Sequence, residues 1–363
     1  MKTAFAIFII LHGIIHFMGF SKAFKLAEIS QLNQYIGKTA GAFWLLAGLL
    51  FLVSAILVFS RNEWWWVPGL AAVVISQILI LLSWQDARYG TIANLIIFIT
   101  LVAGFGTWNF HRSFINDYKQ SLSRTERITN EPLTNSDIQH LPLPVKRYLT
   151  YTGVLNHDKV KNALIRFNGE MRSKKMDWFK FQSVQYNFYD VPSRLFYMTA
   201  QIKGLNVSGY HSYKNGIASM QIKPFGLFPF VDEKGEMLDK TETVTLFNDM
   251  CLISPATLID KSIIWEEIDS LSTKAYFTCN GITISAILYF NKTGQLVNFI
   301  SNDRYDMSGD TAVNYRFSTP VYDYKNINGI NIFTRGEAIW HYPEGEFVYG
   351  KFYLESIAYN INR

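Results

Sequence analysis

Four long apolar runs occupy the first 110 residues of this 363-residue chain, and they constrain its fold more than any other feature. They cover Thr3–Phe20, Thr39–Phe59, Trp65–Ser83 and Thr91–Phe110. A helix needs about 20 apolar residues to cross a hydrocarbon core, and each run comes close to this length. Trp64 and Trp108 stand near run ends, where indole rings favour the membrane interface. The sequence therefore predicts a multi-domain, multi-pass membrane protein in which residues 1–112 form a four-helix transmembrane bundle.

The first run allows a second interpretation. Lys2, an apolar stretch and the sequence Ser21-Lys22-Ala23 could be a signal peptide with its cleavage site. However, His12 and His16 lie within the run, which also continues to Phe20, beyond the usual apolar region of a signal peptide. We therefore expect a retained span.

Basic residues that flank the runs indicate the orientation. With four crossings, the side of the N-terminus carries Lys2, Arg61, Arg112, Lys119, Arg124 and Arg127. The opposite side carries Lys22, Lys25, Lys38 and Arg88. Because an excess of Lys and Arg marks the cytoplasmic side, we expect the domain after residue 112 to be cytoplasmic, with an extracytoplasmic domain as the alternative.

The charge of the chain limits the classes of molecule that it could bind. The net charge is +5, and bases concentrate only just after the last apolar run, which argues against nucleic acid and favours anionic lipid headgroups. The membrane bilayer is thus the predicted partner.

Cys251 and Cys279 are the two cysteines, too few for a disulfide framework. They could pair in an oxidising compartment, but buried free thiols are the plainer interpretation.

The second half of the chain changes to a period of two. We expect a polar linker over residues 113–135, and then an α+β domain over 136–363 built on a curved antiparallel sheet or half-barrel. Ile282–Phe290 alternates apolar and polar side chains, and Asn291–Gly294 turns the chain into Leu296–Asp303. Other predicted strands are Ala163–Met171, Trp178–Tyr189, Arg194–Ile202, Val207–Tyr213, Ala275–Cys279, Ala312–Phe317, Ile332–Tyr342 and Phe347–Tyr359.

Residues 243–260 interrupt these strands with a helical pattern. Val244, Phe247 and Cys251 fall on one helical stripe, and Ser254-Pro255 opens a second short helix. An apolar helix pair inserted into a sheet has to lie on that sheet, so we expect a helical plug. The acidic run 232–242 before it is predicted to be a solvated turn, or to place Asp239 and Glu242 near the helix N-terminus.

Aromatic residues are dense along the predicted strands, more than one helical plug could cover. An uncovered apolar concavity suits a lipid or another hydrophobic ligand. The residues predicted to line this site are Phe196, Met198, Phe247, Met250 and Trp265, with Asn248 or Asp249 meeting a headgroup. The main hypothesis is thus a non-enzymatic, membrane-tethered module that binds a lipid or a lipoprotein and needs no cofactor.

Two chemical alternatives stay open. Glu337, His341 and Glu346 could serve a hydrolase or transferase acting on membrane-derived substrates, although no nucleophile motif accompanies them. His12 and His16 lie one helical turn apart and could bind metal or haem or relay protons. The simpler interpretation is that the two imidazoles form hydrogen bonds across the bundle to Ser54, Ser76, Gln77 or Asn94.

Several motifs carry a family resemblance. Residues 130–363 resemble an uncharacterised bacterial family of unknown function, and the motifs are Phe196-Tyr197-Met198, Gly204-Leu205, Glu242–Cys251, Leu288–Asn291 and Trp340–Phe347. This resemblance implies the inner membrane of a bacterium and no known activity. The strand-rich domain is similar in architecture to LolA-type lipoprotein carriers, and Leu11–Phe20 is similar to openings of DoxX-like membrane proteins.

Overall fold

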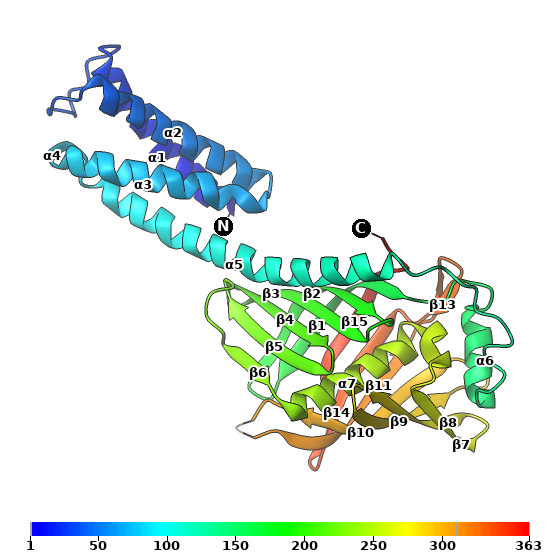
Figure 1. The fold of residues 1–363 in the computed structure, drawn as a ribbon. Coiled ribbons are helices and arrows are strands. Elements are labelled where there is room, and N and C mark those ends of the chain that lie inside the picture. Colours follow the sequence, from blue (N-terminus) through cyan, green and yellow to red (C-terminus); the bar gives the residue numbers. More distant parts are fainter. Residues whose placement is uncertain (1, 310, 363) are drawn as a thin grey trace. The chain divides into compact units, whose positions relative to one another are not determined.

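The computed structural model describes residues 2–309 and 311–362 and divides into two compact units. One comprises Met1–Phe110 with Phe225–Leu227, and the other comprises His111–Pro224 with Phe228–Arg363. The first unit is helical and the second holds the sheet (Figure 1). The predicted combination of apolar helices with a curved antiparallel sheet is confirmed.

Apolar helices build the first unit. They are α1 (Lys2–Ala23), α2 (Lys38–Phe59), η1 (Glu63–Trp65), α3 (Trp66–Leu82), α4 (Trp84–Ala87) and the first part of α5 (Gly90–Thr125). Four of the helical segments are long and apolar enough to cross a membrane by length and composition. Leucine and isoleucine also cover their outward faces, for example Leu11, Ile56 and Leu82. Helices that are apolar on all sides suit a lipid environment.

Glycine at positions 13 and 19 lets α1 and α2 approach closely. A Cβ atom at Gly13 would lie 2.9 Å from Cβ of Phe51, and one at Gly19 would lie 2.4 Å from the ring of Trp44. Neither position has room for a side chain. Close backbone approach through small residues is how helices pack in membranes, where burial of apolar surface provides no driving force.

His12 and His16 join a buried polar network inside this bundle. His12 Nε2 donates to Asn94 Oδ1 at 2.9 Å, and His16 Nε2 lies 2.8 Å from Ser76 Oγ. Because His16 Nδ1 donates to the His12 carbonyl at 2.8 Å, the neutral ring accepts at Nε2 from Ser76. The interpretation as hydrogen bonds across the bundle is confirmed, with Asn94 and Ser76 as partners. Within residues 2–309 and 311–362, no group of three His, Cys, Asp or Glu side chains is placed to hold a metal.

Helix α5 corrects the predicted linker. The helix continues to Thr125, so residues 113–125 are helical and only the rest of 113–135 connects. Phe114, Tyr118 and Leu122 repeat at helical spacing, and Phe114 and Leu122 are buried. Tyr118 stacks on Tyr186 at 4.4 Å between ring centroids. The polar residues around this stripe hid the helical period in the sequence.

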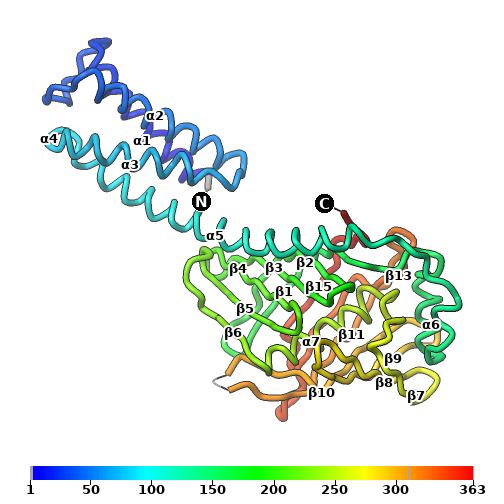
Figure 2. Tube along the Cα trace, in the orientation of Figure 1, coloured from blue at the N-terminus to red at the C-terminus, as the bar shows by residue number. Residues whose placement is uncertain are grey.

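Thirteen strands form one antiparallel sheet in the second unit, in the order β6-β5-β4-β3-β2-β1-β15-β14-β11-β10-β9-β8-β7. The first meander contains β1 (Asn162–Ser173), β2 (Met176–Phe188), β3 (Ser193–Ile202), β4 (Leu205–Lys214), β5 (Ile217–Pro224) and β6 (Val231–Lys234). The second contains β7 (Ile263–Asp269), β8 (Ser272–Cys279), β9 (Ile282–Phe290), β10 (Leu296–Asp306), β11 (Val313–Tyr322), β14 (Arg335–Tyr342) and β15 (Gly345–Tyr359). Figure 2 follows the chain to the place where β15 pairs with β1 and joins the meanders.

Helix α6 and two short strands also belong to this unit. Helix α6 (Leu143–Thr152) precedes β1, and β12 (Lys325–Ile327) pairs with β13 (Ile330–Ile332) as a separate ribbon. The sequence prediction missed β5, β6 and β12 altogether and joined the last residue of β13 to β14. Short edge strands such as β6 carry too few residues for a clear period of two.

Helix α7 (Glu236–Leu252) and η2 (Pro255–Ile259) connect β6 with β7, the two edge strands of the sheet. A flat sheet of this width would measure about 58 Å, whereas the 17 residues of α7 span about 26 Å. The sheet therefore has to curve, and α7 lies within the curve (Figure 1). The predicted plug at 243–260 is confirmed, although it begins at Glu236.

The main core lies between α7 and the sheet. Phe247 is fully buried, with its ring centroid 5.1 Å from that of Phe277 and 5.9 Å from that of Phe299. Helix α6 joins this core through Tyr148, whose hydroxyl donates to the Cys251 carbonyl at 2.9 Å. Cys251 and Cys279 are free and buried, so the thiol interpretation is confirmed. Burial raises the pKa of both thiols, which keeps them protonated.

We expect Asn94→Leu to destabilise the helical bundle by about 1–2 kcal/mol, because it removes the hydrogen-bond partner of His12 and Ser76 in a buried site. Thermal unfolding of the full chain in detergent measures this effect. Thr100→Ala is the matched control, since Thr100 is only partly buried on the same helix and its hydroxyl donates to the Ile96 carbonyl of its own turn. Equal melting temperatures for the two variants would contradict the prediction.

Candidate functional site

The inner face of the sheet, which is the face that carries α7, holds the candidate site. Successive side chains of a strand point to opposite faces, so Arg194 and Phe196 of β3 point inward while Tyr197 points outward. Tyr197 packs on the outer face against Phe114 of α5, with 5.3 Å between ring centroids. Helix α5 therefore covers this part of the outer face.

A buried cluster of charges fixes α7 to this face. Arg194 Nε lies 2.8 Å from Asp249 Oδ2, and Arg194 Nη1 lies 3.2 Å from Glu242 Oε2. Each of these three residues is less than a tenth exposed. Removing three charges from water is costly, and their close pairing offsets that cost.

Two amides complete the charge cluster. Gln185 Nε2 donates to Asp249 Oδ2 at 2.7 Å, and Asn187 Nδ2 donates to the same oxygen at 3.1 Å. Both amides lie on β2 and point inward, between the outward-facing side chains of Val184, Tyr186 and Phe188. Sequence reasoning missed Arg194, Gln185 and Asn187. The sequence carried one signal for these residues: polar side chains alternate with apolar ones along β2 and at the start of β3.

His211 lies beside the charge cluster on β4. Its Nδ1 is 4.0 Å from Glu242 Oε1. Burial lowers the pKa of His211 to about 4; Glu242 opposes this shift, and the cations Arg194 and Arg304 add to it. His211 is therefore neutral at pH 7.

Arg304 is a second inward-facing cation, but it has no carboxylate partner among the described residues. Its guanidinium lies 4.0 Å from the ring centroid of Phe317 and 5.3 Å from that of Trp340. Its Nη1 donates to the Tyr349 hydroxyl at 3.1 Å. Its Nε is buried without any hydrogen-bond partner. The cation is thus held by aromatic faces and one hydroxyl, and one of its donors is left unused.

Apolar side chains surround Arg304 on the inner face and form what we call the aromatic patch. It consists of two clusters that share the partly buried Phe352, and its members include Phe181, Phe196, Met198, Phe317, Trp340 and Phe352. The Phe352 ring centroid lies 5.5 Å from that of Phe181. The patch therefore joins the two arms of the curved sheet.

The residues predicted to bind a ligand do not lie together. Phe196 and Met198 belong to the aromatic patch, whereas Phe247 and Met250 fill the core under α7. Trp265 lies on the edge strand β7 and packs against that core. Asp249 belongs to the charge cluster, and Asn248 Nδ2 donates to Thr319 Oγ1 at 3.1 Å. Glu242, expected near the helix N-terminus or in a solvated turn, is buried against Arg194.

The residues predicted to be catalytic lie on the outer face. His341 Nδ1 is 3.4 Å from Glu346 Oε1, and His341 Nε2 is 2.8 Å from Ser318 Oγ. Glu337 stands four residues from His341 and opposite Lys351, so it does not join them. Ser318 could act as a nucleophile by type and distance, but it is only 2% exposed. Its hydroxyl is therefore buried, and Ser318, His341 and Glu346 form a polar group on the outer face.

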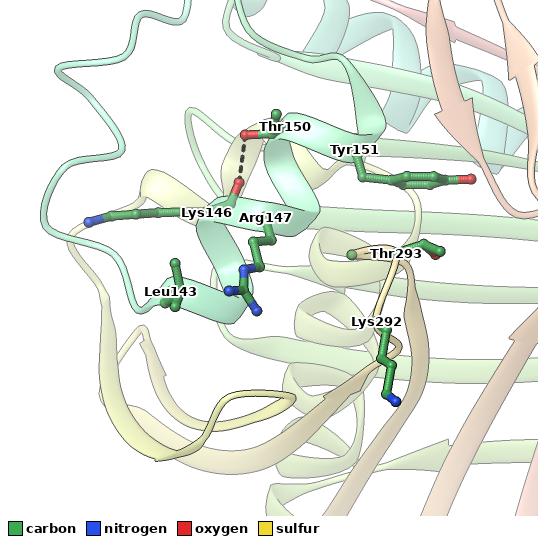
Figure 3. Close-up of a pocket in the computed structure, with 8 residues that line it drawn as sticks. Leu143, Lys146, Arg147, Thr150, Tyr151, Lys292 and Thr293 are labelled. Atoms are coloured by element: carbon green, nitrogen blue, oxygen red, sulfur yellow. Dashed lines mark hydrogen bonds between the residues drawn. The ribbon is translucent and has the colours of Figure 1, made fainter.

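An open cleft of about 460 Å³ lies between α6 and the turn from β9 to β10. It is lined by Leu143, Lys146, Arg147, Thr150, Tyr151, Lys292, Thr293 and Gly294. Figure 3 shows Lys146 and Arg147 leaving α6 in different directions. The positive charges of this cleft therefore do not converge on one point.

Fold and site together define a two-unit protein with four candidate membrane-spanning segments and a curved sheet whose inner face is aromatic and cationic. A family model described as a family of unknown function (DUF6544) matches residues 131–352, more than half of the chain. The chain belongs to this family. The predicted membership in a family of unknown function is confirmed. A comparison with curated proteins finds no match.

Solved structures similar to this chain include a LolA superfamily protein from Nitrosomonas europaea. The two are 10% identical with a TM-score of 0.35, and the match covers 59% of this chain and 93% of that chain. A DUF1329 family protein from Desulfovibrio piger is 12% identical with a TM-score of 0.34, covering 61% and 93%. The predicted likeness to LolA-type proteins is thus found, but TM-scores of this size support no statement about ligand or activity. The DoxX-like resemblance stays a prediction.

We expect Arg194→Met to lower the free energy of unfolding by about 3–5 kcal/mol, because it leaves Glu242 and Asp249 buried without a cation. Denaturant unfolding of the full chain, followed by circular dichroism, measures this loss. Arg335→Met is the control, since its ion pair with Asp323 is exposed and contributes at most about 1 kcal/mol. Combining Arg194→Met with Glu242→Gln and Asp249→Asn should recover part of the stability. A loss no larger than that of the control would refute the role of the charge cluster.

His211 makes stability depend on pH. Its pKa is about 4 in the folded chain, below the ordinary value of 6.5, so the unfolded chain binds more protons between these two values. Stability from His211 is therefore complete above pH 6.5 and is lost as pH falls toward 4. Melting temperatures over this range should fall more steeply for the wild type than for His211→Gln. Parallel curves for the two proteins would show that His211 does not contribute.

Proposed function

We propose that the protein is a membrane-tethered module that binds one amphiphilic molecule with an acyl chain on the inner face of its sheet. The apolar chain would lie along the aromatic patch, and an anionic headgroup would meet Arg304. A membrane lipid and a lipoprotein acyl group both have this chemistry. The observation that carries the proposal is the buried Arg304 Nε, which has no hydrogen-bond partner and lies beside the aromatic patch.

The apolar surface beyond α7 supports this proposal. Under α7 the core is closed, as the full burial of Phe247 indicates. Further along the inner face, several apolar side chains are only partly buried, including Met171, Phe179, Ile202, Phe347 and Phe352. A continuous and partly exposed apolar surface of this kind suits an apolar ligand.

The charge distribution supports an anionic headgroup. Arg194 is balanced by Glu242 and Asp249, whereas Arg304 has no carboxylate within the described residues. A charge-assisted hydrogen bond from Arg304 Nε to a carboxylate or phosphate would satisfy the buried donor. The Tyr349 hydroxyl, already bonded to the same guanidinium, could bond to the ligand as well.

The alternatives from the sequence have weaker support. Hydrolysis through His341 and Glu346 would need an accessible nucleophile, and Ser318 is buried. A metal, haem or proton-relay role of His12 and His16 would compete with their hydrogen bonds to Asn94 and Ser76. We also propose that the protein lies in the inner membrane of a bacterium. The distribution of Lys and Arg favours a sheet on the cytoplasmic side.

Delipidated full-length protein should bind dansyl-labelled undecanoate, with a rise in dansyl fluorescence, more tightly than the methyl ester of the same compound. Arg304→Gln should weaken binding of the acid about 10-fold or more and abolish the preference over the ester, because a hydrogen bond to a charged group contributes about 1.5–3 kcal/mol. Met198→Asp should weaken both ligands, since it puts a charge in the path of the chain.

Arg316→Gln is the matched control for Arg304→Gln. Arg316 lies on β11 beside Phe317, but it points to the outer face and is exposed. Native mass spectrometry of protein purified in mild detergent would identify a copurified lipid or acyl group by mass. The proposal fails if the wild type binds neither probe, or if both arginine variants bind them equally well.

A further inference from the structure

The loop between β5 and β6 exposes two phenylalanines. Its sequence is Phe225-Gly226-Leu227-Phe228-Pro229-Phe230, and Phe228 and Phe230 are 78% and 83% exposed. A phenylalanine left in water forgoes the stabilisation that burial of its ring would contribute. Two such side chains on one loop call for a partner that would cover them.

The backbone holds this loop in one shape. Phe225 and Gly226 both have positive φ, at 50° and 68°. Positive φ is unusual for a phenylalanine and marks a tight turn. Beyond the turn, the Phe230 amide donates to the Ile222 carbonyl at 2.8 Å, which closes the loop at its base. Pro224 and Pro229 restrict the chain further. The exposed rings therefore belong to an ordered projection.

Part of the loop belongs to the unit that contains the candidate membrane-spanning helices. Phe225–Leu227 group with residues 1–110. Within that unit, a Cβ atom at Gly106 of α5 would lie 2.4 Å from Leu227 Cδ2, and one at Gly226 would lie 2.3 Å from the Gly106 carbonyl oxygen. Gly106 falls near the end of the last apolar run, two residues before Trp108. The loop thus contacts α5 where that run approaches its predicted membrane boundary.

We propose that this loop inserts Phe228 and Phe230 into the headgroup region of the lipid bilayer. Val207 pairs with Pro224, so the turn from β3 to β4 lies at the same end of the sheet as the loop. That turn carries the exposed Lys203, followed by Leu205, which is 47% exposed. Aromatic rings with a lysine nearby suit the interface of a membrane that contains anionic lipids. The inference does not depend on ligand binding at the inner face.

The test uses the full chain in nanodiscs of phosphatidylcholine and phosphatidylglycerol. Phe228→Cys and Phe230→Cys are labelled with the fluorophore NBD, and lipids with a nitroxide near the headgroup serve as quenchers. Ile217→Cys is the matched control, because Ile217 is 70% exposed but lies at the opposite end of β5. Wild-type protein, whose two cysteines are buried, measures background labelling.

We expect the labels at positions 228 and 230 to be quenched several-fold more strongly than the label at position 217, with emission shifted to the blue. Equal quenching at the three positions would overturn the proposal. A blue shift at 228 and 230 without lipid-dependent quenching would also overturn it, because it would indicate contact with protein. Melting temperatures equal to that of the wild type would establish that the exposed substitutions leave the fold intact.

Discussion

The position of α7 depends on one buried cation. Glu242 and Asp249 face the sheet from the helix, and two carboxylates in that place would repel each other and lose their hydration. Arg194 lies between them at 3.2 and 2.8 Å, and amides from β2 bond to Asp249 as well. The charge cluster therefore both permits the helix to lie inside the curve and determines where along the sheet it lies. An apolar core alone would tolerate sliding of α7, whereas directed ion pairs do not.

Helix α7 in turn divides the inner face into two parts. Beneath it, Phe247 and its neighbours form a closed core that stabilises the curve. Beyond it, Arg304 lies against the aromatic patch, and side chains packed on the patch, such as Phe347 and Phe352, are only partly buried. The chain links this surface to helices apolar enough to span a membrane. If these helices span a membrane, as we propose, the module would meet amphiphiles at high local concentration.

The sequence predicted the architecture better than the site. Alternation along Ile282–Phe290 and the helical stripe at Val244, Phe247 and Cys251 identified the sheet and its plug, because burial of one face leaves a period in the sequence. The same reasoning assigned Phe247 and Met250 to a ligand site, although they pack in the core. A stripe indicates that a face is covered, but it does not tell whether protein or ligand covers it. The spacing of apolar residues was also overlooked in short segments such as β6. It was overlooked as well in the last turns of α5, where polar residues surround the apolar ones.

The sequence by itself determined that long apolar helices precede an antiparallel sheet, and that a helix interrupts the strands. These properties are local, since they depend on run length and on the spacing of apolar residues. Only the tertiary structure decided that Arg194 meets Glu242 and Asp249, that His341 lies on the outer face, and that Arg304 is left with an unpaired donor. Such pairings join residues tens of positions apart, and they depend on strand order and on the curve of the sheet. No spacing within one segment contains that information.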